Sequence, residues 1–378
     1  MNNDVLERFR HLKSLSQLDP GNTQLTRACM EAALQARAYD FVLERAEKTL
    51  ATATADIAAL FDKGSALIGL REYRAAAAIL QDVLARQPQL QAARINLGLC
   101  HYCLGEFSEA RAPLDAAYAD GDRSAGLLRL IVSTYHHLGL MDEAVALCEA
   151  NPQPVGADAA LAGTYALVYL DADEAQAAGE WAARALAGNP RSVDGLVVDG
   201  TLRILDMEVN RAKREFELAL ELAPNTARAW IGLGTLALLE NDLPRARAQL
   251  TRGVELMPGH VGSWHVLAWT HLMGNDLDAA EAALQRSLEL DRNFGETHGA
   301  LAAVAALRGK REEAERGIEV ALRLDANCLS AQFARSVLIG RAGNTDEAKR
   351  LIRVTAAGLA SGGDSMLNRA IGRATRRH

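Results

Sequence analysis

The stretch AWIGLGTLALLENDLPRARAQLTRGVELMPG, residues 229–259, decides the fold of this chain. Its pattern of small and apolar residues returns along the sequence at a spacing of 34 residues, and a fixed period of this length is typical of repeat architectures. In one unbroken phase, repeats begin at residues 23, 57, 91, 125, 159, 193, 227, 261, 295 and 329. The sequence therefore predicts ten repeats over residues 23–362, in place of the two or three separate domains that a length of 378 residues suggests.

Two positions of the repeat carry small residues. Nine of the ten repeats have alanine at position 20, and eight of ten have a small residue such as Gly234 at position 8. Small side chains let two helices cross closely, because larger ones would force the helix axes apart. Each repeat is therefore predicted to contain two crossing helices. The residues at position 20 are Val42, Ala76, Ala110, Ala144, Ala178, Ala212, Ala246, Ala280, Ala314 and Ala348.

Two further positions mark the ends of these helices. Glycine or asparagine at position 15 accepts the left-handed backbone conformation that ends a helix, and proline at position 32 ends the second helix of the repeat. The pattern predicts an all-α chain in which each repeat is a helix, a turn, a second helix and a second turn. Position 15 holds Gly105, Gly139, Asn241, Asn275, Gly309 and Gly343, and position 32 holds Pro88, Pro190, Pro224 and Pro258.

With Trp230, Leu233, Gly234, Ala246 and Pro258 at positions 4, 7, 8, 20 and 32, the repeat resembles the tetratricopeptide repeat family. The resemblance covers residues 23–362 and is strongest in the repeats that begin at residues 227 and 261. It implies an α-solenoid, a right-handed superhelix in which the first helices of the repeats line a concave groove. Residues 1–22 look like half a repeat that forms an N-terminal capping helix, and residues 363–378 look like a basic C-terminal capping helix.

A few residues depart from the family pattern. Lys63, Asp199 and Arg335 occupy position 7, which is usually apolar, and the segment NPQP at residues 151–154 shortens the second helix of the repeat that begins at residue 125. We expect these repeats to pack less tightly than their neighbours.

Composition argues against several classes of function. With 41 basic and 48 acidic residues the net charge is -7, whereas nucleic-acid binding needs a clustered basic surplus. No apolar run reaches the ~18 residues of a membrane helix, no export signal is recognisable, and an odd number of cysteines is typical of reduced thiols. We expect a cytoplasmic protein that neither binds nucleic acid nor inserts into membranes. The one basic cluster, typical of a solvated end, is Arg369, Arg373, Arg376 and Arg377.

Catalytic motifs are missing from the sequence. It has no glycine-rich phosphate loop, no HExxH and no nucleophile elbow, and the repeats leave no segment for a separate catalytic domain within these 378 residues. We therefore expect a protein that is not an enzyme and has no cofactor. One alternative is a metal- or thiol-dependent sensor or enzyme, because Cys103, His137 and Asp171 stand at position 13 of successive repeats with His136 alongside. In the simpler interpretation these side chains are ordinary packing and surface residues.

The groove implied by the family is formed by positions 2, 5, 9, 12 and 13 of each repeat, and only eight of these fifty residues are charged. The family's clamp for acidic tails and its asparagine ladder are both absent. An apolar concave surface predicts contact with an apolar helical or extended segment of a protein partner, or self-association. The candidate partner-binding residues are Phe61, Ile95, Leu99, Tyr102, His136, Leu167, Val197, Ile231, Leu238, Trp269 and Met273.

The leading hypothesis is therefore a non-catalytic scaffold or adaptor that binds protein partners in this groove. A narrower alternative is a chaperone or assembly factor for a secretion, pilus or envelope machine. The sensor or enzyme centred on Cys103, His137 and Asp171 is the alternative from a different functional class.

Overall fold

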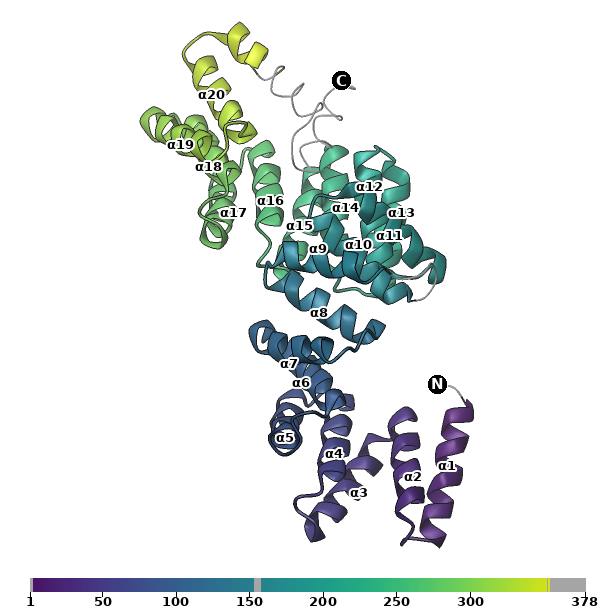
Figure 1. The fold of residues 1–378 in the computed structure, drawn as a ribbon. Coiled ribbons are helices and arrows are strands. Elements are labelled where there is room, and N and C mark those ends of the chain that lie inside the picture. The colour runs from purple at the N-terminus through teal and green to yellow at the C-terminus, as the bar shows by residue number, and fades with distance from the viewer. Residues whose placement is uncertain (1–2, 153–157, 352, 354–378) are drawn as a thin grey trace. The chain divides into compact units, whose positions relative to one another are not determined.

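The computed structural model describes residues 3–152, 158–351 and 353, and in these residues it consists of α-helices joined by short turns (Figure 1). The chain is an all-α solenoid. Helix α1 (Asn3–Leu18) comes first and packs on α2. The first helices of the repeats, which we call inner helices, are α2 (Thr23–Gln35), α4 (Ile57–Gly69), α6 (Gln91–Leu104), α8 (Ala125–His137), α10 (Ala159–Asp171), α12 (Val193–Leu205), α14 (Ala227–Leu239), α16 (Val261–Met273), α18 (Gly295–Leu307) and α20 (Leu329–Arg341).

The second helices of the repeats, which we call outer helices, alternate with them along the chain. Each packs on the inner helix of its own repeat, and most also pack on the inner helix that follows. They are α3 (Tyr39–Thr52), α5 (Tyr73–Arg86), α7 (Phe107–Ala119), α9 (Met141–Ala150), α11 (Ala175–Gly188), α13 (Val209–Leu222), α15 (Leu243–Leu256), α17 (Leu277–Leu290) and α19 (Arg311–Leu324).

Capping side chains explain why several inner helices begin at the first residue of a repeat. Asp56, Asp158 and Ser192 precede α4, α10 and α12, and each accepts a hydrogen bond from the N–H three residues later. These bonds satisfy backbone donors that have no partner inside the helix. Asn22 and Ser124 cap α2 and α8 in the same way.

The turn between the two helices of a repeat uses a left-handed residue in all ten repeats. At position 15, Gly105 has φ 75° and Asn241 has φ 60°. The next N–H then reaches back to the last turn of the helix, as from Asp242 N to Ala237 O at 2.8 Å. The sequence predicted this conformation for glycine and asparagine alone. The structure shows it also for Arg37, Arg71, Asp173 and Met207.

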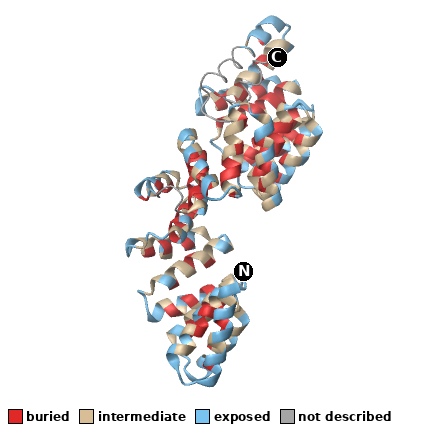
Figure 2. Ribbon diagram, turned by 90° about the vertical axis from the view of Figure 1, so that its right-hand side faces the viewer, coloured by how far each residue is buried: buried red, intermediate tan, exposed pale blue. Residues whose placement is uncertain are grey.

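Close crossing of the two helices explains the small residues at positions 8 and 20. Ala246 is fully buried, and a Cβ atom added to Gly234 would lie 2.6 Å from Leu250 Cγ. A larger side chain at either position would separate the helices. Figure 2 shows the result, with buried residues gathered where helices face each other and exposed residues in the turns.

The chain divides into two compact units, residues 1–152 and residues 153–378, which we call the N-terminal unit and the C-terminal unit. The division falls in the NPQP segment, where α9 ends at Ala150 after only 10 residues. Pro152 cannot donate a backbone hydrogen bond, so the helix does not continue. Each unit is described by itself. The predicted C-terminal capping helix, residues 363–378, lies outside the described residues, as do residues 354–362 of the last repeat.

The polar residues at position 7 are accommodated by ion pairs or by exposure. Lys63 Nζ lies 2.9 Å from Glu47 Oε1, and Arg335 is exposed. Asp199 accepts hydrogen bonds from Arg203 and Arg211, each at 3.1 Å. None of the described helices is both long enough and apolar enough to cross a lipid bilayer.

Candidate binding site

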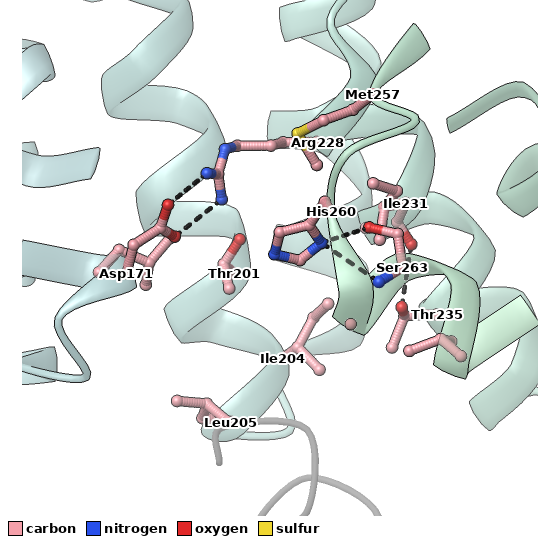
Figure 3. A pocket seen from close by; sticks show the side chains of 14 residues that line it. Asp171, Thr201, Ile204, Leu205, Arg228, Ile231, Thr235, Met257, His260 and Ser263 are labelled. Atoms are coloured by element: carbon pink, nitrogen blue, oxygen red, sulfur yellow. Dashed lines mark hydrogen bonds and ion pairs between the residues drawn. The ribbon is translucent and has the colours of Figure 1, made fainter. Parts of the chain in front are cut away.

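A pocket of about 220 Å³ lies in the C-terminal unit among four inner helices, α10, α12, α14 and α16 (Figure 3). The last residues of α10 and the second half of α12 meet the first and central turns of α14 and α16 there. Most of the wall is apolar. The lining residues are Leu170, Asp171, Thr201, Ile204, Leu205, Arg228, Ile231, Gly232, Thr235, Met257, His260, Gly262, Ser263 and Val266.

Small residues on consecutive repeats leave the pocket hollow. Gly262 and Ser263 form the first turn of α16, and Thr201 and Thr235 stand at position 9 of their repeats. Both threonine hydroxyls donate to their own helix, Thr201 to Val197 O at 2.8 Å and Thr235 to Ile231 O at 2.9 Å. Because these hydroxyl protons are already bonded, the threonine wall is less polar than its composition suggests.

An ion pair between Asp171 and Arg228 lies on one side of the pocket (Figure 3). Arg228 Nη1 donates to Asp171 Oδ1 at 2.9 Å, and Arg228 Nη2 donates to Asp171 Oδ2. The pair is mostly shielded from water, since the two side chains are 20% and 23% exposed. It joins the end of α10 to the start of α14, two inner helices that are not consecutive in the chain.

His260 forms another part of the wall, and its ring points into the pocket (Figure 3). Its Nδ1 atom accepts a hydrogen bond from the backbone N–H of Ser263 at 3.2 Å and lies 2.6 Å from Ser263 Oγ. The imidazole therefore caps α16, a role that is more often taken by aspartate, asparagine or serine. Since Nδ1 accepts the cap bond, the proton of the neutral ring is on Nε2.

Replacing Arg228 with leucine is expected to lower the free energy of unfolding of the C-terminal unit by about 1 kcal/mol, because Asp171 loses a bidentate partner in a shielded place. Urea unfolding followed by circular dichroism measures the loss. The charge-reversed pair Asp171→Arg with Arg228→Asp should recover most of it. Arg252→Leu is the control, since that arginine is 46% exposed on α15 and its loss should cost much less. Equal losses in both arginine variants would contradict the structural role of the pair.

The structure places the eleven candidate partner-binding residues in different environments. Ile231 lines the pocket. Val197 is only 1% exposed within the core, so a partner cannot reach it, whereas Met273 is 53% exposed. Trp269 is half-buried, and its Nε1 donates to His265 Nε2 at 2.9 Å. The others are half-buried, namely Phe61, Ile95, Leu99, Tyr102 and His136 in the N-terminal unit and Leu167 and Leu238 in the C-terminal unit.

The candidate metal ligands are engaged elsewhere. The His137 ring stacks on Phe107 with 4.3 Å between ring centroids, and Asp171 pairs with Arg228. Cys103 is exposed, but burial raises the pKa of the Cys100 thiol beside it to about 12, so that thiol is not readily deprotonated. Within the described parts of the chain, no group of three histidine, cysteine or acidic residues is placed to hold a metal ion.

Sequence reasoning missed several residues that line the pocket. Asp171 and Thr201 stand at groove positions of their repeats but are not among the candidate partner-binding residues, and Met257, His260 and Ser263 lie outside the groove positions. The signal that could have found them is a run of small residues at inner-helix positions of consecutive repeats.

Comparison with known proteins identifies the repeat. Family models of the tetratricopeptide repeat match residues 61–125, 208–261 and 261–294. A search of curated proteins by sequence finds no match.

Several solved structures are similar to this chain. YrrB, described as a tetratricopeptide repeat protein with an unusual peptide-binding site, is 20% identical, with a TM-score of 0.36 over 50% of this chain and 95% of its own. PilF of Pseudomonas aeruginosa is 18% identical, with a TM-score of 0.41 over 57% of this chain and 96% of its own. MamA is 20% identical, with a TM-score of 0.34 over 41% and 91%. The family models thus identify tetratricopeptide repeats in both compact units.

Proposed function

We propose that this protein is a non-catalytic scaffold that binds an apolar segment of a protein partner, helical or extended, at the pocket among α10, α12, α14 and α16. Tetratricopeptide repeats are generally protein-interaction modules without catalytic activity. The observation that carries the proposal is the pocket itself, an apolar hollow of about 220 Å³ on inner helices of the C-terminal unit.

The size of the pocket favours one side chain of a segment over a whole small molecule. Pockets that enclose a small-molecule ligand usually have about 300–1,000 Å³. A volume of about 220 Å³ suits one large aliphatic or aromatic side chain, with the rest of the segment lying along the neighbouring inner helices. Arg228 lies in the same wall, and its guanidinium has N–H groups beyond those that bond to Asp171, which can bond to carbonyl groups of the bound segment.

A peptide library displayed on phage and selected against the full chain tests this proposal. We expect selected peptides to share one large apolar residue. Thr201→Phe, which fills the pocket, and Met257→Lys, which puts a charge in its wall, should each weaken binding at least tenfold, about 1.4 kcal/mol, in fluorescence polarisation. Thr251→Lys on α15 is the matched control, because residue 251 is exposed on an outer helix.

Circular dichroism melting shows whether each variant keeps its fold. If folded Thr201→Phe and Met257→Lys bound the selected peptides as tightly as Thr251→Lys does, the peptides would bind elsewhere and the proposed site would be wrong.

A further inference from the structure

The turns that follow α10, α12 and α14 carry an excess of acidic residues beside the pocket. These carboxylates, which we call the acidic edge, are Asp173, Glu174, Asp206, Glu208, Glu240 and Asp242. Leu170, Asp171, Ile204 and Leu205 line the pocket and are the last residues of α10 and α12, so the pocket adjoins this edge at the turns that follow these two helices.

The basic residues of these turns do not balance the acidic edge. Arg203 pairs with Asp206 and Glu208, and Arg211 also pairs with Glu208, but both arginines are shared with Asp199 as well. Arg245 pairs with Glu240. The C-terminal ends of α10 and α12 add the negative end of the helix dipole on this side of the pocket, whereas α14 and α16 contribute residues from their first and central turns. One side of the pocket therefore combines an apolar floor with a negatively charged border.

The chain itself contains a segment with the complementary chemistry. Met366, Leu367, Ala370 and Ile371 recur at the spacing that places apolar side chains on one face of a helix. Residues 365–378 contain no acidic residue and include Arg369, Arg373, Arg376 and Arg377. A peptide of this composition offers large apolar side chains to a pocket and basic side chains to its border.

The length of chain is sufficient for the segment to reach the pocket. Met366 follows the last described residue, Arg353, by 13 positions, which can span up to about 45 Å when fully extended. Only α18 lies between α16 and α20 in the series of inner helices. With ~8–10 Å between neighbouring helix axes, two such spacings put α20 about 16–20 Å from α16, the helix of the pocket wall that comes last in the series.

We propose that residues 366–377 of this chain bind in the pocket of the same molecule, so that a protein partner has to displace them. This inference rests on the proposed function, because it names the first occupant of the same site. Attachment to the same chain gives the segment an effective concentration in the millimolar range. Even a weak contact therefore keeps the segment bound in the pocket in most molecules. The apparent affinity for a partner then falls by the fraction of molecules in which the pocket is open.

Photo-crosslinking in the full chain tests the proposal directly. Leu367 is replaced by p-benzoylphenylalanine, and crosslinked peptides are mapped by mass spectrometry after irradiation. We expect crosslinks within one chain to pocket residues such as Leu205 and Met257, and a lower yield at 0.5 M salt, because salt screens the arginines from the acidic edge. The same probe at Leu290, exposed on α17, should give no crosslink to the pocket.

Other crosslinking results would overturn the proposal. Crosslinks from Leu367 to the pocket of a second chain would show that another copy fills it. Crosslinks only to other surfaces, or none, would show that the segment does not bind there. The plugged variant Thr201→Phe must lose the pocket crosslinks while its helix content is unchanged, since crosslinks that persisted in it would contradict binding inside the pocket.

A competition measurement separates this inference from the proposed function. Ile371→Lys removes an apolar contact and keeps the segment basic, so it should bind a pocket-dependent selected peptide about tenfold more tightly than the wild type. Asn368→Lys, on the other face of the predicted helix, is the matched control and should bind as the wild type does. If both variants bound the peptide equally, the inference would fail and the proposed function would stand. If crosslinks map to the pocket but no peptide binds there in Ile371→Lys, the inference stands and the proposed function fails.

Discussion

Replacing Gly299 with alanine is expected to lower the free energy of unfolding of the C-terminal unit by about 3 kcal/mol, the upper end of the usual cost of overpacking. A Cβ atom at this position would lie 2.5 Å from the backbone nitrogen of Ala331 and 2.8 Å from Cys328 Sγ. Side chains can rotate away from such an overlap, but the first turn of α20 cannot. The helices α18 and α20 would therefore have to separate along their contact.

Urea unfolding followed by tryptophan fluorescence measures this effect, since Trp264 and Trp269 lie on the neighbouring helix α16. Gly126→Ala is the control. An added Cβ atom at residue 126 meets nothing within 4 Å, so alanine in helix α8 should raise stability by about 0.5–1 kcal/mol. An unchanged unfolding midpoint in Gly299→Ala would mean that α18 and α20 are not in the close contact described above.

Lowering the pH from 7.5 to 4 is expected to destabilise the C-terminal unit through His265, by on the order of 3 kcal/mol. His265 is 7% exposed, and burial lowers the pKa of its imidazole from 6.5 to about 4, against a smaller opposing effect of Glu296. The proton of the neutral ring is on Nδ1, because Nε2 accepts from Trp269, and Nδ1 has no hydrogen-bond partner among the residues that the structure describes.

The sign of this effect follows from proton binding. Well above pH 6.5 the ring is neutral in the folded and the unfolded chain, so His265 causes no change there. Between pH 6.5 and about 4 the unfolded chain binds a proton that the folded chain does not bind, and stability is lost as the pH falls.

His265→Gln tests the assignment, since glutamine still offers an acceptor to Trp269 and does not titrate. Urea unfolding of both proteins at pH 7.5 and pH 4.5 should show a clearly smaller loss in the variant. Equal losses would assign the pH dependence to other groups.

The sequence was sufficient to predict the helices because small residues, capping residues and left-handed turn residues recur in one phase. The inner helices begin at the first residues of the ten repeats for this reason. Four turns were harder to predict from the sequence. Arg37, Arg71, Asp173 and Met207 adopt the left-handed backbone conformation there, which their residue types do not favour. In these turns the packing of the two flanking helices imposes the left-handed backbone conformation, although the residue types disfavour it.

The candidate site was harder to predict from the sequence, because a pocket forms where the side chains of neighbouring helices leave space unfilled. The repeat frame assigns both Ile231 and Val197 to the groove, but Ile231 lines the pocket whereas Val197 packs within the core. Whether a position faces solvent or a neighbouring helix depends on the relative rotation of consecutive inner helices, which one residue pattern does not encode. The ion pair of Asp171 with Arg228 joins two repeats that are not adjacent, and a repeat-by-repeat comparison cannot reveal it.

The contacts within each compact unit join a helix mainly to its immediate neighbours along the chain. This arrangement determines which genetic changes the protein tolerates. Duplicating or deleting 34 codons in frame adds or removes one helix pair and leaves the other interfaces in register. Inserting a single codon inside a helix rotates every later residue of that helix by about 100° and moves its small residues away from the crossing. The gene can therefore lengthen or shorten by whole repeats during evolution far more readily than by single codons.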